Sequence, residues 1–385
     1  MDKRKFIKQL TKGSLALASS SWLLEACSSS SQNDSLSSLS GKDQKLWSWA
    51  RPNENWSLED WKRKLAQAKD SGIDAILLEV YNGKNAFFDT DRLDVKEDLL
   101  GQIVPICKEL GLEFHAWMWT MLCPNPKIVE QHPDWYAVNG LGQPATTHPA
   151  YVDYYKFLDA YHPEVQEYVR QNVNSLAQIS EIDGVHLDYV RLPDVIIAEA
   201  LQPKYNIVQD REYPEYDYSY SDICRKMFKE KTGIDPLTDL EDPSTNEAWR
   251  QFRYDGISNL VNGKLVPEAK KFNKMITAAV FPNWESVRQE WHTWDLDAFL
   301  PMLYHNFYNR DLSFIKEHTE AALSRMKVKK PIYSGVYLPS LTPDQLIEAN
   351  EMAIAGGAKG MSTFAFDGLT DEYMAALKKI KQSKI

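Results

Sequence analysis

The feature that most constrains the fold of this 385-residue chain is a regular alternation of apolar runs and amphipathic patterns from residue 44 onward. Such alternation is typical of βαβ units, in which helices join parallel strands. We expect strands over residues 44–49, 73–80, 113–119, 184–189, 275–281, 298–304, 332–336 and 360–366. Helical patterns cover residues 57–69, 99–110, 163–177, 220–231, 247–271, 312–326, 342–355 and 372–381. The count predicts an α/β fold, a (β/α)8 TIM barrel.

A doubly wound parallel sheet is the competing architecture. Sheets of that kind that bind nucleotides carry a glycine-rich phosphate loop after the first strand. The segment that follows residue 49 contains no such loop, so we favour the barrel.

Two connections between strands and helices, residues 120–162 and 191–219, are long for a single catalytic domain. Loops of this length are usually functional, and the loops after barrel strands 3 and 4 belong to the catalytic face. Both are rich in tyrosine. Aromatic rings suit stacking on sugar rings, although packing within the loops explains any single tyrosine equally well.

The N-terminus has the pattern of an export signal. Basic residues precede a short apolar run over residues 15–24, which is too short to span a bilayer. The sequence Leu24-Glu25-Ala26-Cys27 resembles a lipobox, which implies that Cys27 is lipidated. We therefore expect an export signal over residues 1–27, a serine-rich flexible tether over 28–43 and the barrel domain over 44–385.

These features predict a cell-envelope lipoprotein, periplasmic or anchored in the outer membrane, with the membrane as a partner through its lipid. Ordinary signal-peptidase cleavage near Ala26 is the alternative. The segment Lys3-Arg4-Lys5 also resembles a twin-arginine signal with lysine in the first position, so the export route stays open.

Charge and cysteine content exclude several functions. The formal net charge is −10 and the body of the chain has no basic patch, so we expect no nucleic-acid partner. The three cysteines after Cys27 are Cys107, Cys123 and Cys224, which have no CxxC spacing. They predict neither a disulfide framework nor a zinc site, although Cys123 and Cys224 could pair. We expect no cofactor and no metal.

The fourth expected strand carries the clearest candidate for chemistry. It reads Asp183-Gly184-Val185-His186-Leu187-Asp188-Tyr189, and its period of two places His186 and Asp188 on one face. Asp188 lies at the carboxyl end, where barrel enzymes hold catalytic groups. Asp183 begins the strand, and we assign it a structural capping role. Arg191 follows, and it either binds substrate or forms an ordinary ion pair.

This stretch, with Leu158-Asp159 and Pro163-Glu164-Val165-Gln166 upstream, resembles the glycosyl-hydrolase-like family of exported bacterial TIM-barrel proteins that includes peptidoglycan glycan-strand hydrolases. His115-Ala116-Trp117, residues 297–304 and residues 360–366 follow in the order of family motifs. The resemblance implies a barrel that acts on glycosidic bonds of a poly- or oligosaccharide, with Asp188 as the best-matched acid. Relatives with glycan-strand activity tend to carry an amide at the end of strand two, where this chain has Glu79.

Glycoside hydrolysis normally needs two carboxyl groups. Glu79, Asp367 and Glu285 all follow or end expected strands. We rank Glu79 first, because an acid that closes an apolar strand is costly to bury without a role or a partner. The alternative is a structural ion pair between Glu79 and Arg51 or Arg191.

Further polar and aromatic residues at strand ends are candidates for substrate binding. They are His115, Trp117, His186, Arg191, Trp284, Tyr304 and Asn306, with Trp49 and Trp119 as further stacking platforms. For each tryptophan, packing in the barrel interior is an equal explanation.

The sequence thus predicts an exported glycoside hydrolase with Asp188 and either Glu79 or Asp367 as its catalytic carboxyl groups. Two alternatives stay open. One is a carbohydrate-binding surface lipoprotein that keeps the barrel and has lost hydrolysis. The other is a metal-dependent hydrolase whose site comprises His115, His186 and His305.

Overall fold

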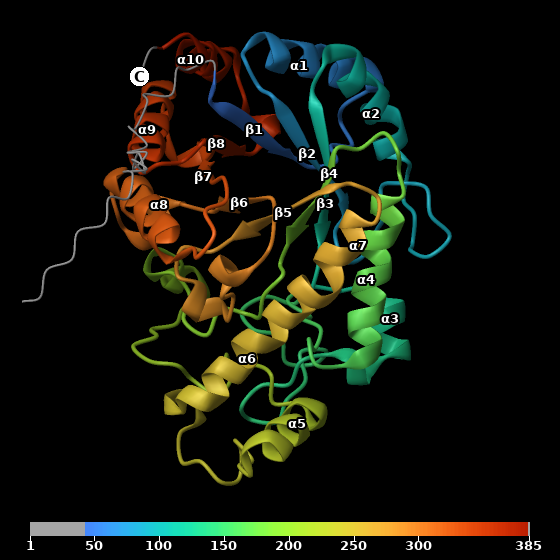
Figure 1. The fold of residues 1–385 in the computed structure, drawn as a ribbon, viewed down its shortest axis with the longest axis vertical. Helices are drawn as coiled ribbons and strands as arrows, with labels where there is room; N and C mark the ends of the chain where they lie inside the picture. The colour runs from blue at the N-terminus through green and yellow to red at the C-terminus, as the bar shows by residue number, and fades with distance from the viewer. Residues whose placement is uncertain (1–42, 384–385) are drawn as a thin grey trace, which may run out of the picture. The chain divides into compact units, whose positions relative to one another are not determined.

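The computed structural model describes residues 43–383, which form a (β/α)8 barrel (Figure 1). All paired strands are parallel, in the order β6-β5-β4-β3-β2-β1-β8-β7. Isolated parallel bridges between Phe299 and Ile332 and between Met302 and Gly335 join β6 to β7. The strands are β1 (Lys45–Ala50), β2 (Ala75–Tyr81), β3 (Glu113–Trp119), β4 (Gly184–Asp188), β5 (Met275–Val280), β6 (Ala298–Pro301), β7 (Tyr333–Tyr337) and β8 (Gly360–Phe364). The predicted barrel is confirmed.

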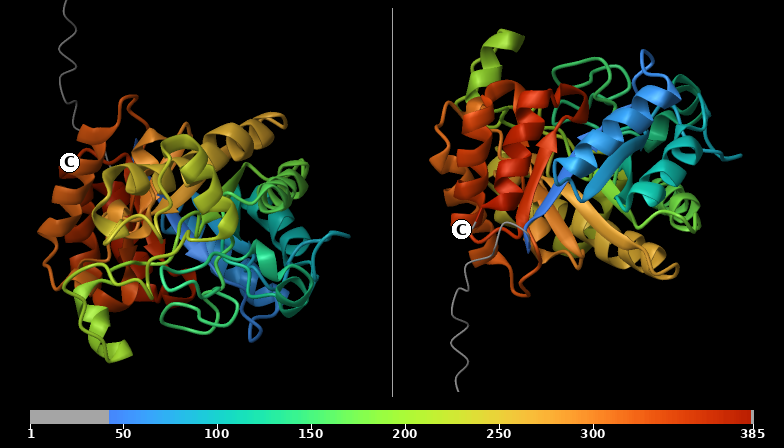
Figure 2. Two further views of the ribbon diagram at one scale, coloured as in Figure 1. Left: turned by 90° about the horizontal axis from the view of Figure 1, so that it is seen from below. Right: turned by 90° about the horizontal axis from the view of Figure 1, so that it is seen from above.

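Helices surround the strands, as the view from above in Figure 2 shows. The α-helices are α1 (Leu58–Asp70), α2 (Leu99–Leu110), α3 (Pro126–Gln131), α4 (Pro163–Ala177), α5 (Asp222–Thr232), α6 (Glu247–Leu260), α7 (Val266–Lys270), α8 (Ser313–Arg325), α9 (Pro343–Ala355) and α10 (Asp371–Gln382). The capping box of Ser57 and Asp60 begins α1, and Pro163 occupies the first turn of α4, as the sequence predicts. Among the described residues, no helix is long and apolar enough to cross a membrane.

The structure departs from the sequence-based expectation in three elements. The single helix expected over residues 247–271 is divided by a π-helical turn, Val261–Leu265. Pro267 explains this division, because it lacks an N–H and its ring would clash with the carbonyl of Gly263 in a regular α-helix. Only two 3₁₀ turns, Trp284–Val287 and Trp291–Thr293, lie between β5 and β6. Strand β6 ends at Pro301, three residues earlier than expected.

Three aspartates at the amino ends of alternate strands fix the bottom of the barrel. Each stands just before an even-numbered strand, and its carboxylate accepts a backbone N–H from the preceding strand. The bonds join Leu46 N to Asp74, Phe114 N to Asp183 and Ile276 N to Asp297, at 2.8, 2.7 and 2.8 Å. Each aspartate also pairs with a lysine. The structural capping role predicted for Asp183 is confirmed.

The remaining cysteines Cys107, Cys123 and Cys224 are buried free thiols, so the possible pair of Cys123 and Cys224 does not form. Burial raises the pKa of the Cys107 thiol to about 12, as expected for an unreactive core residue. Cys27, the export signal and nearly all of the tether lie outside the described residues, and those predictions stay untested.

Candidate active site

A cavity of about 490 Å³ opens at the carboxyl ends of the strands. Its floor and walls include Trp49, Glu79, Trp117 and Asp188 from the first four strands. The long loops after β3 and β4 add further aromatic and polar side chains, among them Tyr154. We call this space the aromatic cavity. This volume lies within the range of about 300 to 1,000 Å³ that is typical of ligand pockets, and it suits a ligand of at most a few sugar rings.

Asp188 is buried at the end of β4, with 8% of its surface exposed. Its Oδ2 accepts a hydrogen bond from Trp117 Nε1 at 3.1 Å, and its Oδ1 accepts one from the Tyr189 N–H at 2.6 Å. Tyr189 has a φ of 50°, in the left-handed region, which non-glycine residues enter only at some cost. Burial raises the pKa of Asp188 to about 6, against the opposing effects of these donors and Arg191.

Glu79 is the second carboxyl group of the aromatic cavity, and it is 5% exposed. Its Oε2 accepts a hydrogen bond from Trp119 Nε1 at 3.2 Å. Burial raises the pKa of Glu79 to about 7, and the charge of Asp188 adds to this effect while Arg51 opposes it. Within residues 43–383 no Lys, Arg or His nitrogen lies within 4.0 Å of this carboxyl group. The predicted alternative, an ion pair with Arg51 or Arg191, is therefore not formed.

The two acids stand on either side of β3. Glu79 lies beside Trp117 in the β2–β3 register, and Asp188 lies beside Trp119 in the β3–β4 register. Each indole therefore donates diagonally across the sheet, Trp117 to Asp188 and Trp119 to Glu79. One strand thus supplies the hydrogen-bond donor for both carboxyl groups.

Of the residues predicted to bind substrate, Trp117, Arg191 and Tyr304 line the aromatic cavity, as do the further predicted platforms Trp49 and Trp119. Arg191 donates from Nη1 to Asp194 Oδ2 at 3.0 Å, and its guanidinium lies 4.5 Å from the Phe281 ring centre. Tyr304 lies three residues beyond the end of β6 at Pro301.

Other predicted residues lie elsewhere. His115 is fully buried, with its ring 4.3 Å from that of Trp47 in the barrel interior. His186 is also fully buried, and it accepts from Trp49 Nε1 at 2.9 Å while its Nδ1 lies 2.9 Å from Thr277 Oγ1. Neither histidine lines the aromatic cavity. Each comes two residues before a side chain of its own strand that does, since His115 precedes Trp117 and His186 precedes Asp188.

The remaining candidates lie on other connections. Trp284 packs against Tyr254 and His292 and lines a separate small pocket beyond β5, and Glu285 is exposed on the same turn. Asn306 follows β6 without lining the aromatic cavity. Asp367 is exposed after β8 and lines a second cavity that also borders Glu79.

The three-histidine metal site considered from the sequence does not assemble. Both ring nitrogens of His186 already have partners, and His305 belongs to a 3₁₀ turn after β6. In the part of the chain that the structure describes, no group of three or more His, Cys, Asp or Glu side chains is placed to hold a metal ion.

Sequence reasoning missed several cavity residues. Arg51 lies just past the end of β1, and Tyr337 and Phe364 end β7 and β8, so the rule that strand ends build the site would have found all three. Lys204 and Tyr205 come from the loop after β4, where no sequence pattern marks them.

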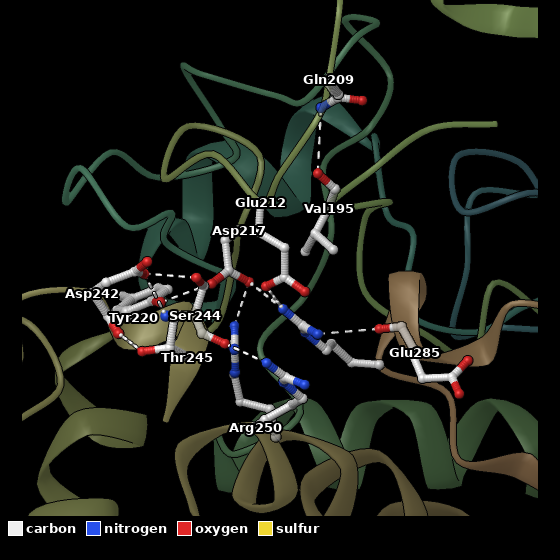
Figure 3. A network of polar contacts seen from close by, with 12 residues as sticks. Val195, Gln209, Glu212, Asp217, Tyr220, Asp242, Ser244, Thr245, Arg250 and Glu285 are labelled. Atoms are coloured by element: carbon white, nitrogen blue, oxygen red, sulfur yellow. Dashed lines mark hydrogen bonds and ion pairs between the residues drawn. The ribbon is translucent and has the colours of Figure 1, made fainter. Parts of the chain in front are cut away.

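A buried ion-pair network anchors this loop (Figure 3). Asp217 of the loop accepts bonds from Arg253 of α6, from Arg288 beyond β5 and from the Tyr220 hydroxyl. Burial opposes ionisation of Asp217, yet the two guanidinium groups lower its pKa below the ordinary value. Arg288 also bonds Glu212, which Figure 3 shows beside Asp217. The network therefore ties the C-terminal part of this loop to α6 and to the turn after β5.

Comparisons with known proteins agree with this architecture. The glycoside hydrolase domain of PgaB (BpsB) from Bordetella bronchiseptica matches with a TM-score of 0.67 and 13% identity, covering 89% of this chain and 99% of that one. The catalytic domain of β-amylase from Paenibacillus polymyxa matches with a TM-score of 0.63 and 13% identity, covering 90% and 99%. A β-galactosidase from Halorubrum lacusprofundi matches with a TM-score of 0.61 and 13% identity, covering 88% and 57%. At these identities the likeness shows a shared fold.

A search of curated protein sequences finds no match. The family model described as glycosyl hydrolase-like 10 matches residues 87–349, well over half of the chain. This match confirms the family predicted from the strand-four motif, and with it a glycosidase-type function. The chain belongs to the glycosyl hydrolase-like 10 family.

Proposed function

We propose that this protein is an exported glycoside hydrolase that cleaves O-glycosidic bonds of a poly- or oligosaccharide with Glu79 and Asp188 as its carboxyl pair. The observation that carries the proposal is the presence of both acids in one cavity with unequal raised pKa values, about 7 for Glu79 and about 6 for Asp188. When the environments of two carboxyl groups push their pKa values apart, the group with the higher pKa acts as the acid and the other as the base. Between these values Glu79 keeps its proton while Asp188 is ionised.

We propose the roles that this order of pKa values favours. Glu79 donates its proton to the glycosidic oxygen as the bond from that oxygen to the anomeric carbon breaks. The Asp188 carboxylate either attacks the anomeric carbon directly or takes a proton from the water that attacks it. The configuration of the first-formed product distinguishes the two routes, since direct attack retains the anomeric configuration and water attack inverts it.

The test is product release from a panel of polysaccharides and purified glycan strands, comparing the protein with Asp188→Asn and Glu79→Gln. Each variant replaces a carboxyl group by an amide of the same shape. We expect each to be at least about a hundredfold slower on the glycan that the wild type cuts. Binding of a panel sugar by all three proteins, with no cleavage by the wild type, would instead support the carbohydrate-binding alternative.

The proposal places the enzyme in the cell envelope, anchored by a lipid on Cys27. It rests on the basic, apolar and lipobox-like segments of residues 1–27. Palmitate labelling of cells that express the protein tests it: label should enter the wild type and be absent from Cys27→Ser. Label-free wild type in the soluble periplasmic fraction would indicate ordinary signal-peptidase cleavage.

A further inference from the structure

A second cavity of about 300 Å³ adjoins the aromatic cavity. The two share Arg51 and Glu79. The other polar side chains of the second cavity come from the loops after β1, β2 and β8, and they include Asn53, Lys96 and Asp367. We call this space the polar pocket. Glu79 therefore stands at the boundary between two spaces that cover different sectors of the barrel mouth.

Asp188 is not placed in the same way. It lines the aromatic cavity and has no part in the polar pocket. A group that attacks or activates water must reach the anomeric carbon, whereas the acid must reach the oxygen that leaves. The sugar whose anomeric carbon reacts therefore belongs on the side of Asp188, and the leaving sugar belongs on the other side of Glu79.

On this basis we propose that the polar pocket is the binding site for the leaving sugar, so that the glycan lies across Glu79 and is cut between rings held in the two cavities. The inference rests on the proposed function and adds the direction in which the glycan lies in the site. The sugar in the polar pocket leaves as an alcohol, because the proton of Glu79 passes to its glycosidic oxygen while the bond to the anomeric carbon breaks.

The chemistry of the two cavities fits this division. Trp119 and Tyr154 give the aromatic cavity accessible flat faces on which a sugar ring can stack. The polar pocket offers amide, ammonium and carboxylate groups, which bond hydroxyl groups in either direction. Lys96 forms an ion pair with Glu54, which also lines the pocket.

Arg51 lies at the boundary between the two cavities, since its side chain lines both. Within the described residues its guanidinium has no acidic partner within 4.0 Å, and it lies 5.0 Å from the centre of the Phe364 ring. Its donors therefore stay available to an oxygen at the junction of the two cavities.

The test compares two kinds of substrate with the full-length protein. One is the tetrasaccharide of whichever panel glycan the wild type cuts, taken from cellotetraose, chitotetraose, maltotetraose and a glycan-strand fragment. The other is the 4-nitrophenyl glycoside of the same sugar, whose leaving group departs readily and needs no sugar site. The variants are Lys96→Ala and Asn53→Ala, and the matched control is Lys127→Ala. Lys127 also forms an exposed ion pair, with Asp94, and lines neither cavity.

We expect kcat/KM on the tetrasaccharide to fall about tenfold in each pocket variant, as for loss of one hydrogen bond. Activity on the nitrophenyl glycoside should stay within about twofold of the wild type, and the control should match the wild type on both substrates. An equal loss on both substrates, or no loss on either, would overturn the inference. So would a wild type that cuts the nitrophenyl glycoside and leaves the tetrasaccharide intact, although glycosidase activity would then stand. A wild type that cuts no panel glycan would remove the proposed function and the inference with it.

Discussion

Trp117 offers a way to test the role of Asp188 without touching the carboxyl group. Trp117→Phe keeps an aromatic ring in the cavity wall and removes the Nε1 donor, which lies 3.1 Å from Asp188 Oδ2. A hydrogen bond to a charged group is worth about 1.5 to 3 kcal/mol, and 1.36 kcal/mol corresponds to about one pH unit in a titration. Asp188 must be ionised to act, so the acid limb of the pH profile of kcat/KM should move upward by about one to two pH units.

The assay is the pH dependence of kcat/KM on the nitrophenyl glycoside. The pKa values of about 6 for Asp188 and about 7 for Glu79 predict a narrow bell between the two. Below it Asp188 is protonated and cannot act as base or nucleophile, and above it Glu79 has lost the proton that it must donate.

Trp119→Phe is the matched variant. It removes the Nε1 donor that lies 3.2 Å from Glu79 Oε2 and that lowers the pKa of this group. Its loss should therefore move the basic limb upward and leave the acid limb in place. Activity lost at every pH with an unmoved acid limb in Trp117→Phe would refute the role of Asp188. Movement of the opposite limb in each variant would show that the two roles are reversed.

Three further predictions concern stability. The fold raises the pKa of Glu79 from 4.5 to about 7, so its stabilising contribution is complete below its unfolded pKa and is lost as pH rises through about 7. As pH rises from about 4 to about 8, the free energy of unfolding of Glu79→Gln, measured in urea, should therefore increase by about 3 kcal/mol relative to that of the wild type. A difference between the two proteins that does not change with pH would contradict the burial argument. Asp217→Asn leaves two buried guanidinium groups without their shared carboxylate, and it should lower the free energy of unfolding by about 3 to 5 kcal/mol; a loss under about 1 kcal/mol would mean that the network is not needed. In Gly184→Ala the new Cβ would lie 2.5 Å from His115 Nδ1 and 2.8 Å from the backbone oxygen of Met275, so we expect a loss of about 1 to 3 kcal/mol in the same assay. Wild-type stability would show that both His115 and the neighbouring strand can shift.

Local pattern was sufficient for most of the fold. Apolar runs located all eight strands, and capping residues such as Ser57 located helix starts, because these signals depend on neighbours along the chain. The early end of β6 is predictable only from the proline at position 301. The π turn before α7 is predictable only from the clash between the Pro267 ring and the carbonyl of Gly263 in a regular α-helix. Both are backbone effects that hydrophobic periodicity does not register.

The candidate site was only partly predictable. The rule that strand ends build the barrel mouth placed Asp188 and Glu79 in one cavity, as the sequence suggested. The same rule did not separate His186 from Asp188, which share a face two residues apart. Depth in the barrel decides their roles, since Trp49 and Thr277 from two other strands surround His186.

By itself the sequence determined the barrel class, the two acids at strand ends and the family motif, because strand period and strand order place side chains without knowledge of distant partners. Only the tertiary structure decided that no cation pairs with Glu79 in the described part of the chain, and that the indoles of Trp117 and Trp119 each serve one acid. It also decided that Glu79 borders a second cavity. Burial and the distances between strands set the ionisation of these groups, and both are properties of packed neighbours far apart in sequence.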